Sequence, residues 1–258
     1  MMTNVWAIAY KELRSYFVSP VAYVVLAGFL LLCSWFFWIY LLQFSTYVSM
    51  YAQFQQPQMV AQLNLNDMVM APLLQNMVII FLIMMPLVTM RLFAEERANG
   101  TDELLLTSPI DTLEITFGKF LGAGLFFTVM LGCTLLYPAI LMHYGDPEIG
   151  SIVTGYLGLL LVGLSFIAIG LFTSTLTDNQ IVAAVVSFVI LLLLFAIGWP
   201  ANTVGETAGA ILSYLSLTDH LQPLVEGLLV SSDVIYFLSV IAVALFLSQR
   251  SLESLRWR

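Results

Sequence analysis

Six apolar runs without Asp, Glu, Lys or Arg constrain this sequence more than any other feature. They span residues 21–42, 73–90, 120–142, 152–173, 180–199 and 234–249. A helix needs about 20 residues to cross the apolar core of a bilayer, with about 17–25 the usual range. The last run is slightly short and can be extended by a turn at either end. We therefore predict an all-α membrane protein with six transmembrane helices.

The composition supports this class and argues against catalytic chemistry in the chain. Hydrophobic residues make up 60% of the sequence and charged residues only 9%, whereas soluble domains carry about 25% charged residues. Cys33 and Cys133 both lie within apolar runs, which favours packing over a disulfide or a metal site. His143 and His220 have no partners at the spacing of a triad or a zinc motif. We predict no catalytic, cofactor-binding or metal-ligating residue.

The basic residues indicate how the chain crosses the membrane. With six spans, the N-terminal segment, the segment 91–119 and the C-terminal segment share one side, and all eight Lys and Arg residues fall there. Random sides would give this result about once in a hundred trials, so the positive-inside rule predicts that both termini are cytoplasmic. The opposite side carries only acidic charges, which disfavours nucleic acid as a partner.

Residues 3–19 precede the first apolar run and have an amphipathic pattern. Trp6, Tyr10, Leu13 and Phe17 are spaced so that a helix places them in one narrow stripe. Ser19-Pro20 favours the end of such a helix. We predict an interfacial helix on the inner leaflet, with an ordinary N-terminal tail as the alternative.

The segment 91–119 is the longest polar segment on the predicted cytoplasmic side. It holds nine charged residues: Arg91, Glu95, Glu96, Arg97, Asp102, Glu103, Asp111, Glu114 and Lys119. Gly100 follows Arg97-Ala98-Asn99, which is typical of a helix that ends at a left-handed residue. Thr101 can then cap a second short helix that reaches Thr107.

A second turn, with its own helix-start signals, follows this short helix. Ser108-Pro109-Ile110-Asp111 has the pattern of a helix cap, a first-turn proline and an acidic residue at the third helical position. The pattern therefore predicts a compact helix held between two turns at the membrane surface. Such a rigid element is suited to being pushed by another protein.

Glycines mark the start of the third predicted span. Gly118 and Gly122 form a small-xxx-small face, which allows close helix contact. Lys119 between them is predicted to extend toward the membrane interface. The Gly-Lys pair is not part of a phosphate-binding loop, because Leu113 occupies the position of the first glycine and no strand precedes it.

Two shorter apolar patches, Ala208–Leu215 and Leu221–Val230, lie between the fifth and sixth runs. Neither is long enough to cross a bilayer. We predict that they form surface or re-entrant helices on the external side.

The predicted spans contain no acidic or basic residues that could couple transport to an ion gradient or a membrane potential. Ion-coupled carriers, proton pumps and voltage sensors usually place ionisable residues within the membrane, and the six runs contain none of Asp, Glu, Lys or Arg. The chain also has no nucleotide-binding motif. An external motor that acts on the segment 91–119 is the simplest prediction, and an ion-coupled carrier or channel is disfavoured.

Several motifs carry a resemblance to a known family. The segment Glu95-Glu96-Arg97-x-x-Gly100-Thr101-x-Glu103-Leu104-Leu105, followed by Thr107-Ser108-Pro109 and Gly118-Lys119, resembles permease subunits of type-2 ABC transporters. The gliding-motility and nitrous-oxide-reductase-maturation branch is the most similar. The likeness extends over nearly the whole chain: Lys11-Glu12-Leu13-Arg14, Leu171-Phe172-Thr173-Ser174, Leu215-Ser216-Leu217, His220, Gly227, Asp233 and Tyr236-Phe237.

This resemblance implies one type-2 ABC transmembrane domain over residues 1–258 in a bacterial inner membrane. It implies that residues 93–108 form a coupling element that docks on a cytosolic P-loop ATPase, which binds the ATP and Mg. The docking residues would be Glu95, Glu96, Arg97, Gly100, Thr101, Glu103, Leu104, Leu105, Ser108 and Pro109. Ala98-Asn99 departs from the more usual charged pair before the glycine.

The resemblance also implies partners and a function. Two permease halves, expected to be identical copies, would form the transporter, and the branch suggests a further membrane-anchored partner with a large external domain. The expected function is that of a permease subunit through which ATP hydrolysis drives export or movement of a substrate. The alternative is a mechanotransmitting subunit that moves an external partner while no solute crosses. The substrate and the direction of transport are left open.

Overall fold

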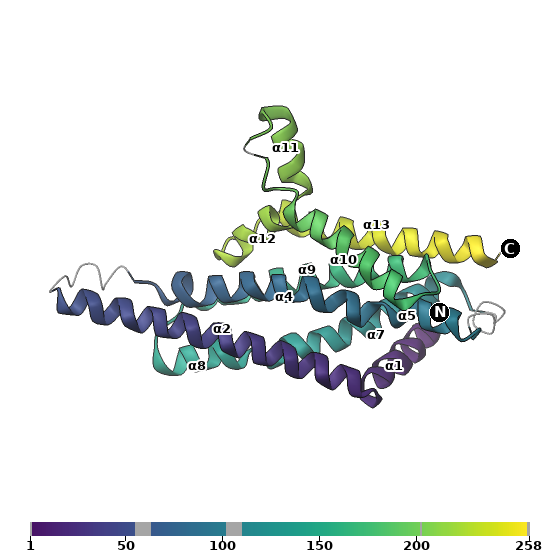
Figure 1. Ribbon diagram of the computed structural model, residues 1–258, viewed down its shortest axis with the longest axis horizontal. Helices are drawn as coiled ribbons and strands as arrows, with labels where there is room; N and C mark the ends of the chain where they lie inside the picture. Colours follow the sequence, from purple (N-terminus) through teal and green to yellow (C-terminus); the bar gives the residue numbers. More distant parts are fainter. Residues whose placement is uncertain (1, 55–62, 102–109, 202, 257–258) are drawn as a thin grey trace.

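The computed structural model describes residues 2–54, 63–101, 110–201 and 203–256, and every regular element within these ranges is a helix. Most of the long helices run roughly along one axis, and both termini lie at the same end of the bundle (Figure 1). The prediction of an all-α membrane protein is thus confirmed.

Within the described ranges, five helical stretches are long and apolar enough to cross a membrane. They are α2 (Pro20–Gln53), the stretch Asn66–Ala98, the stretch Thr112–Tyr144, α9 (Ile149–Thr175) and α13 (Ser231–Arg256). The helix α10 (Gln180–Ala196) coincides with the fifth predicted run but has only 17 residues. Six spans therefore remain a prediction, although a helix stands at each of the six predicted places.

Two of these stretches are divided into shorter elements. Asn66–Ala98 consists of a π-helical turn (Asn66–Met70), α4 (Ala71–Thr89) and α5 (Arg91–Ala98). Thr112–Tyr144 consists of α7 (Thr112–Cys133) and α8 (Leu136–Tyr144). The apolar run 120–142 therefore covers the end of α7, a short turn and most of α8.

Pro138 explains the break between α7 and α8. A proline inside a helix cannot donate to the carbonyl four residues earlier, and its ring clashes with that carbonyl, which here belongs to Thr134. The helix ends just there, in a tight turn in which Thr134 and Leu135 donate to the carbonyls of Leu131 and Gly132 at 3.0 and 3.1 Å.

The stretch between the first two apolar runs, residues 43–72, is helical at both of its ends. Helix α2 continues beyond the apolar run to Gln53, and the π-helical turn before α4 begins at Asn66. A helix needs no apolar side chains once it has left the bilayer, so hydropathy underestimates its length.

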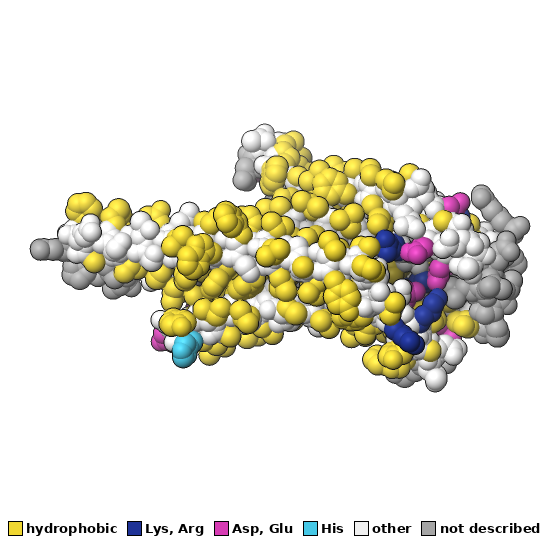
Figure 2. Space-filling view, turned by 60° about the horizontal axis from the view of Figure 1, so that its bottom comes forward, with side chains coloured by type: hydrophobic (Ala, Val, Ile, Leu, Met, Phe, Trp, Pro, Cys, Tyr) yellow, Lys and Arg dark blue, Asp and Glu magenta, His cyan; other side chains and the backbone are white. Residues whose placement is uncertain are grey.

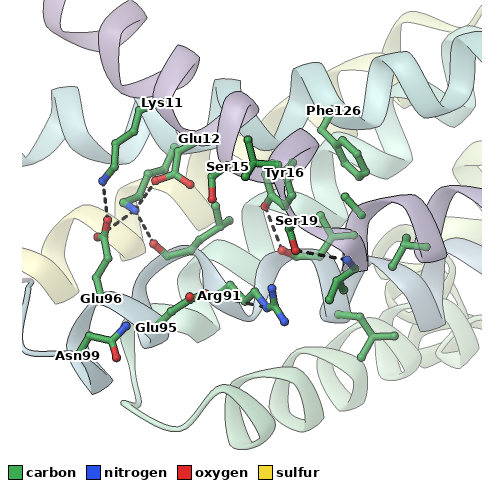
Figure 3. A pocket seen from close by; sticks show the side chains of 18 of the residues that line it. Lys11, Glu12, Ser15, Tyr16, Ser19, Arg91, Glu95, Glu96, Asn99 and Phe126 are labelled. Carbon is green, nitrogen blue, oxygen red and sulfur yellow. Dashed lines mark hydrogen bonds and ion pairs between the residues drawn. The ribbon is translucent and has the colours of Figure 1, made fainter.

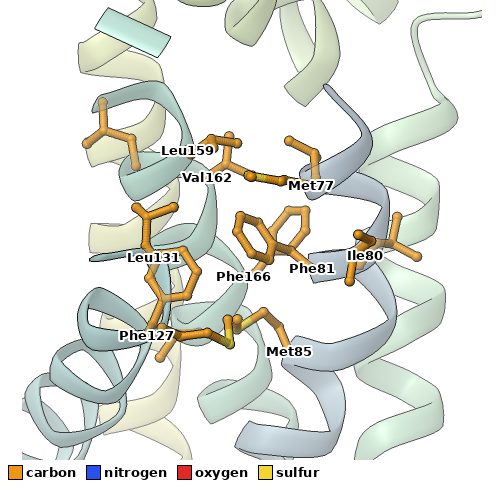
Figure 4. Packing of buried hydrophobic residues seen from close by; sticks show 14 of the residues in the cluster. Met77, Ile80, Phe81, Met85, Phe127, Leu131, Leu159, Val162 and Phe166 are labelled. Atoms are coloured by element: carbon orange, nitrogen blue, oxygen red, sulfur yellow. The ribbon is translucent and has the colours of Figure 1, made fainter. Parts of the chain in front are cut away.

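The core lies where α4, α7 and α9 meet (Figure 4). Met77 and Phe81 of α4, Phe127 of α7 and Phe166 of α9 are fully buried and lie next to one another. The rings of Phe81 and Phe127 meet edge to face with centroids 5.0 Å apart. Gly163 leaves room for the Phe127 ring, because a Cβ at this position would overlap with it. These three helices therefore form one closely packed body.

Two short helices lie between α10 and α13, as the sequence predicted. They are α11 (Glu206–Leu215), which projects away from the bundle in Figure 1, and α12 (Leu217–Val225), which packs against α9. The second is displaced from the patch Leu221–Val230, because it begins at Leu217 and ends at Val225; Gly227, with a left-handed φ of 94°, follows it. Whether either helix enters the bilayer remains a prediction.

The helix α1 (Met2–Val18) lies where the sequence predicted an amphipathic N-terminal helix, and its place at the membrane interface remains a prediction. Trp6, Tyr10 and Phe17 are exposed on the outside of the bundle, with Leu13 half-buried beside them. The other face packs along the start of α7, where Gly118 and Gly122 form the contact. A Cβ on Gly122 would lie 2.6 Å from Cβ of Glu12, so this contact requires glycine.

Candidate functional site

Charged side chains gather at the end of the bundle where the termini lie (Figure 2). We call this the charged end; α1, α5, the start of α7 and the last residues of α9 meet there. Its central element is α5, which continues from α4 after a turn at Met90.

The helix α5 ends at Ala98 and is followed by a left-handed Gly100, as the sequence predicted. Gly100 has a φ of 66°, in the left-handed region that favours glycine. Its N–H donates to the Arg97 carbonyl at 3.1 Å, and the N–H of Thr101 donates to the Glu96 carbonyl at 2.9 Å. This pair of bonds is a Schellman motif, which satisfies carbonyls that the helix end would leave free.

A serine of α9 stabilises the junction between α4 and α5. The Ser174 hydroxyl accepts hydrogen bonds from the N–H groups of Phe93 and Ala94, each at 3.0 Å, and donates to the Met90 carbonyl at 3.1 Å. These backbone groups flank the break in the helical ladder, and Ser174 is fully buried. Insertion of a side chain into the ladder is a recognised cause of a helix kink. Ser174 therefore fixes the direction in which α5 leaves α4.

Lys119 of α7 lies at the centre of a buried ion-pair cluster. Its ammonium group contacts Glu12 of α1 at 2.7 Å, Glu96 of α5 at 3.0 Å and the Leu92 carbonyl at 2.6 Å. The Lys119 side chain is only 2% exposed. The prediction that Lys119 extends to the membrane interface was wrong, because two carboxylates from distant segments neutralise it inside the protein.

Lys11 completes this cluster from the outer side of α1. It donates to Glu96 at 3.1 Å while its own side chain remains 64% exposed. Partial burial alone would lower the pKa of Lys11, but the negative charges of Glu96 and Glu12 and the hydrogen bond to Glu96 outweigh it and raise the pKa. Two ammonium groups and two carboxylates thus join α1, α5 and α7 with no net charge.

Arg97, in the last turn of α5, connects this helix to the end of α9. Its guanidinium contacts Asp178 at 2.8 Å and donates to the Thr175 carbonyl at 2.9 Å. The α5 helix is therefore held at its start by Ser174, along its side by Lys119 and Lys11, and near its end by Arg97.

The remaining predicted docking residues differ in their surroundings. Glu95 is 46% exposed, and its nearest basic group is Arg91 at 4.0 Å. Gly100 and Thr101 are exposed, and the Thr101 hydroxyl donates to the Glu96 carbonyl at 3.2 Å. Glu103, Leu104, Leu105, Ser108 and Pro109, and the short helix that Thr101 would cap, lie outside the described residues.

The predicted restart of the chain needs a correction. Asp111 was expected at the third position of a helix, but its backbone is extended and α7 begins at Thr112. The Asp111 carboxylate instead accepts from the N–H of Leu113 at 3.4 Å and caps this helix. An aspartate serves either position well, so the sequence did not decide between them.

Sequence reasoning missed a second polar cluster, formed by α11, α12 and α13. Nδ1 of His220 lies 2.8 Å from the Asp233 carboxylate, and Nε2 lies 3.0 Å from the Tyr214 carbonyl. The imidazole stacks on Tyr236 with ring centroids 4.0 Å apart. His220 and Asp233 are 13 residues apart in the sequence, and only the fold brings them together.

The fold thus defines a helical protein that crosses the membrane several times, with a buried charge cluster at one end. Comparison with known proteins gives its family. Residues 43–246 match the model of a family described as ABC-2 family transporter protein, and since this is most of the chain, the chain belongs to that family.

Two curated relatives are the probable multidrug ABC transporter permeases YbhR of Escherichia coli strain K12 and of Escherichia coli O157:H7. Each is 32% identical to this chain over 106 residues. The match covers 41% of this chain and only 28% of either relative, so the chain matches less than a third of their length.

Proposed function

We propose that this chain is the permease subunit of an ATP-driven ABC transporter, and that a separate cytosolic ATPase subunit drives it. The charged end would face the cytoplasm, because the basic residues favour that side. Membership of the ABC-2 transporter family supports an ATPase partner. The gliding-motility and nitrous-oxide-reductase-maturation branch remains our assignment within the family.

The observation that carries the proposal is the attachment of α5. This helix leads directly into the segment predicted to dock on the ATPase, and its side chains contact α1, α7 and α9 through Glu96 and Arg97. A displacement of α5 would therefore reach three other helices. Among the described residues, Glu95 and the exposed Gly100–Thr101 turn have no ion pair or hydrogen bond to another helix, and they are our candidates for direct docking.

In this proposal two copies assemble side by side and the substrate passes between them. The substrate and the direction of transport are open.

The first experiment is to purify the tagged protein from its native membrane in mild detergent and identify what accompanies it. We expect a stoichiometric soluble P-loop ATPase. Glu95→Lys should reduce the amount that is retained, because it reverses the charge of the candidate docking residue. If the protein came alone and moved solute in liposomes without ATP, a carrier would replace this proposal.

A glycine substitution then tests coupling. Gly100→Val should abolish stimulation of the ATPase by the permease, because a β-branched residue disfavours the left-handed conformation by about 1–2 kcal/mol. Gly150→Val is the matched control, since a Cβ at Gly150 would also meet open space but its φ lies outside the left-handed region. Equal ATPase stimulation in both variants would contradict a role of the Gly100 turn in coupling.

The alternative is a mechanotransmitting subunit that moves an external partner while no solute crosses. Phe81, Phe127 and Phe166 fill the contact between α4, α7 and α9, so transport would need a route between two copies, and a mechanotransmitting subunit would need none. A stoichiometric partner with a large external domain, together with ATP hydrolysis without solute movement in liposomes, would favour this alternative.

A further inference from the structure

A cavity of about 550 Å³ opens at the charged end between α1, the start of α2, the end of α4 and α5 (Figure 3). Its walls are of two kinds. Toward the end of the bundle it is lined by polar and charged groups, among them Ser15, Arg91 and Glu95. Toward the middle it is lined by apolar groups, among them Val21, Val25 and Leu87.

The apolar wall belongs to helices that are long and apolar enough to span the membrane, α2 and the stretch that contains α4. Val21 and Leu87 are 40% and 44% exposed, so the wall is open on its outer side. Tyr16 stacks on the fully buried Phe126 with ring centroids 4.8 Å apart and closes the inner side. The cavity therefore joins a surface at bilayer depth to the polar boundary of the bundle.

Most charges beside this cavity are paired within the protein. Lys119 contacts Glu12 and Glu96, and Lys11 contacts Glu96. Arg91 differs from both lysines. Its closest carboxylate is Glu95, with Nε and Oε2 4.0 Å apart, which is too long for a hydrogen bond.

The Arg91 side chain has a geometry suited to an anion. Its Nε has no hydrogen-bond partner among the described residues, and the side chain as a whole is 37% exposed and lines the cavity, so the guanidinium can be reached from it. In Figure 3 the guanidinium is turned away from Glu96 and toward the Ser19 side of the cavity. A guanidinium can bind a phosphate through two parallel hydrogen bonds.

We propose that this cavity binds one anionic phospholipid of the leaflet at the charged end. Arg91 contacts the lipid phosphate, and the first part of an acyl chain lies along Val21, Val25 and Leu87. A free phosphate would leave the apolar wall uncovered. A phospholipid would contact the polar wall with its phosphate and the apolar wall with its acyl chain. The proposal does not depend on the transport function.

Native mass spectrometry of the detergent-purified protein titrated with dioleoyl phosphatidylglycerol tests this site. We expect one tightly retained phosphatidylglycerol, with dioleoyl phosphatidylcholine retained more weakly. Arg91→Gln should weaken retention of phosphatidylglycerol about tenfold, because it removes a charge-assisted hydrogen bond. Arg91→Lys should give an intermediate value, since it keeps the charge but loses the paired donors.

Arg14→Gln is the matched control. It removes the same charge from the charged end, but Arg14 does not line this cavity. Equal loss of phosphatidylglycerol in Arg14→Gln and Arg91→Gln would show a nonspecific charge effect and overturn the proposal. Competition by millimolar inorganic phosphate would also overturn it, because the site would then take the anion without the lipid.

A second variant covers the case in which Arg91→Gln does not fold. Val25→Trp places a larger side chain in the apolar part of the cavity and leaves every charge in place. We expect it to lose the tightly retained phosphatidylglycerol while it elutes as a single symmetric peak on size exclusion. Undiminished retention in this variant would exclude an acyl chain at the apolar wall.

Discussion

Replacement of Lys119 by methionine is the sharpest test of the buried ion-pair cluster. Methionine has a similar length and keeps the packing of the side-chain stem, so the variant removes mainly the charge and its hydrogen bonds. Glu12 and Glu96, with side chains 12% and 18% exposed, would then face each other without the ammonium between them. The Leu92 carbonyl, which accepts from Lys119 at 2.6 Å, would also lose its donor.

The expected destabilisation is large. Removal of one member of a buried ion pair costs about 3–5 kcal/mol, because the other charge stays buried without compensation. Lys11 still contacts Glu96, which places the expected value near the lower end, about 3 kcal/mol. Lys11→Met should cost less than about 1 kcal/mol, because the Lys11 side chain is 64% exposed and its ion pair is screened by solvent.

The free energy of unfolding is measured by titration with sodium dodecyl sulfate in mixed micelles, followed by tryptophan fluorescence. Arg14→Gln serves as the control, since it removes a basic charge from an exposed position of α1. Addition of Glu12→Gln to Lys119→Met should recover part of the loss, because one of the two uncompensated carboxylates disappears. If Lys119→Met unfolded at the same detergent fraction as Arg14→Gln, the assignment of a buried, neutralised cluster would be refuted.

Two further predictions concern the other attachments of α5. Ser174→Ala should destabilise the protein by about 2–4 kcal/mol, because it leaves buried backbone groups at the α4–α5 junction without partners. Ser187→Ala is the control, since it removes a buried hydroxyl with no hydrogen-bond partner among the described residues. It should be neutral or stabilising in the same titration. In a double-mutant cycle, Arg97→Gln and Asp178→Asn should show a coupling energy below about 1 kcal/mol, because the Asp178 side chain is 67% exposed. A coupling energy well above that value would mean that the pair is shielded from solvent, for example by a partner.

Local patterns predicted the elements of this fold because local chemistry determines them. The turn after α5 needs a residue with a left-handed backbone at position 100, and this requirement depends only on the residues next to it in the sequence. Gly118 and Gly122 likewise predicted a close contact with another helix. The sequence did not show that this helix is α1 of the same chain.

The environment of Lys119 could not be predicted in the same way. A lysine at the start of an apolar run usually extends to the interface, and nothing nearby in the sequence argues otherwise. Its partners Glu12 and Leu92 lie 107 and 27 residues away, so its burial follows from the tertiary packing of α1 and α5. The contact between His220 and Asp233 was missed for the same reason.

The arrangement of attachments also indicates how a push on α5 would spread. Glu96 and Arg97 are consecutive residues and therefore point in different directions around α5, one toward α7 and α1 and the other toward α9. A rotation of α5 would disturb both contacts, and the buried contact with Lys119 opposes it more strongly than the exposed Arg97–Asp178 pair does. Beyond these contacts, α4, α7 and α9 share one aromatic core, and a close-packed core resists continuous deformation. A displacement that enters at the Gly100 turn would consequently move α5 together with the packed helices, which is the behaviour that the proposed coupling element requires.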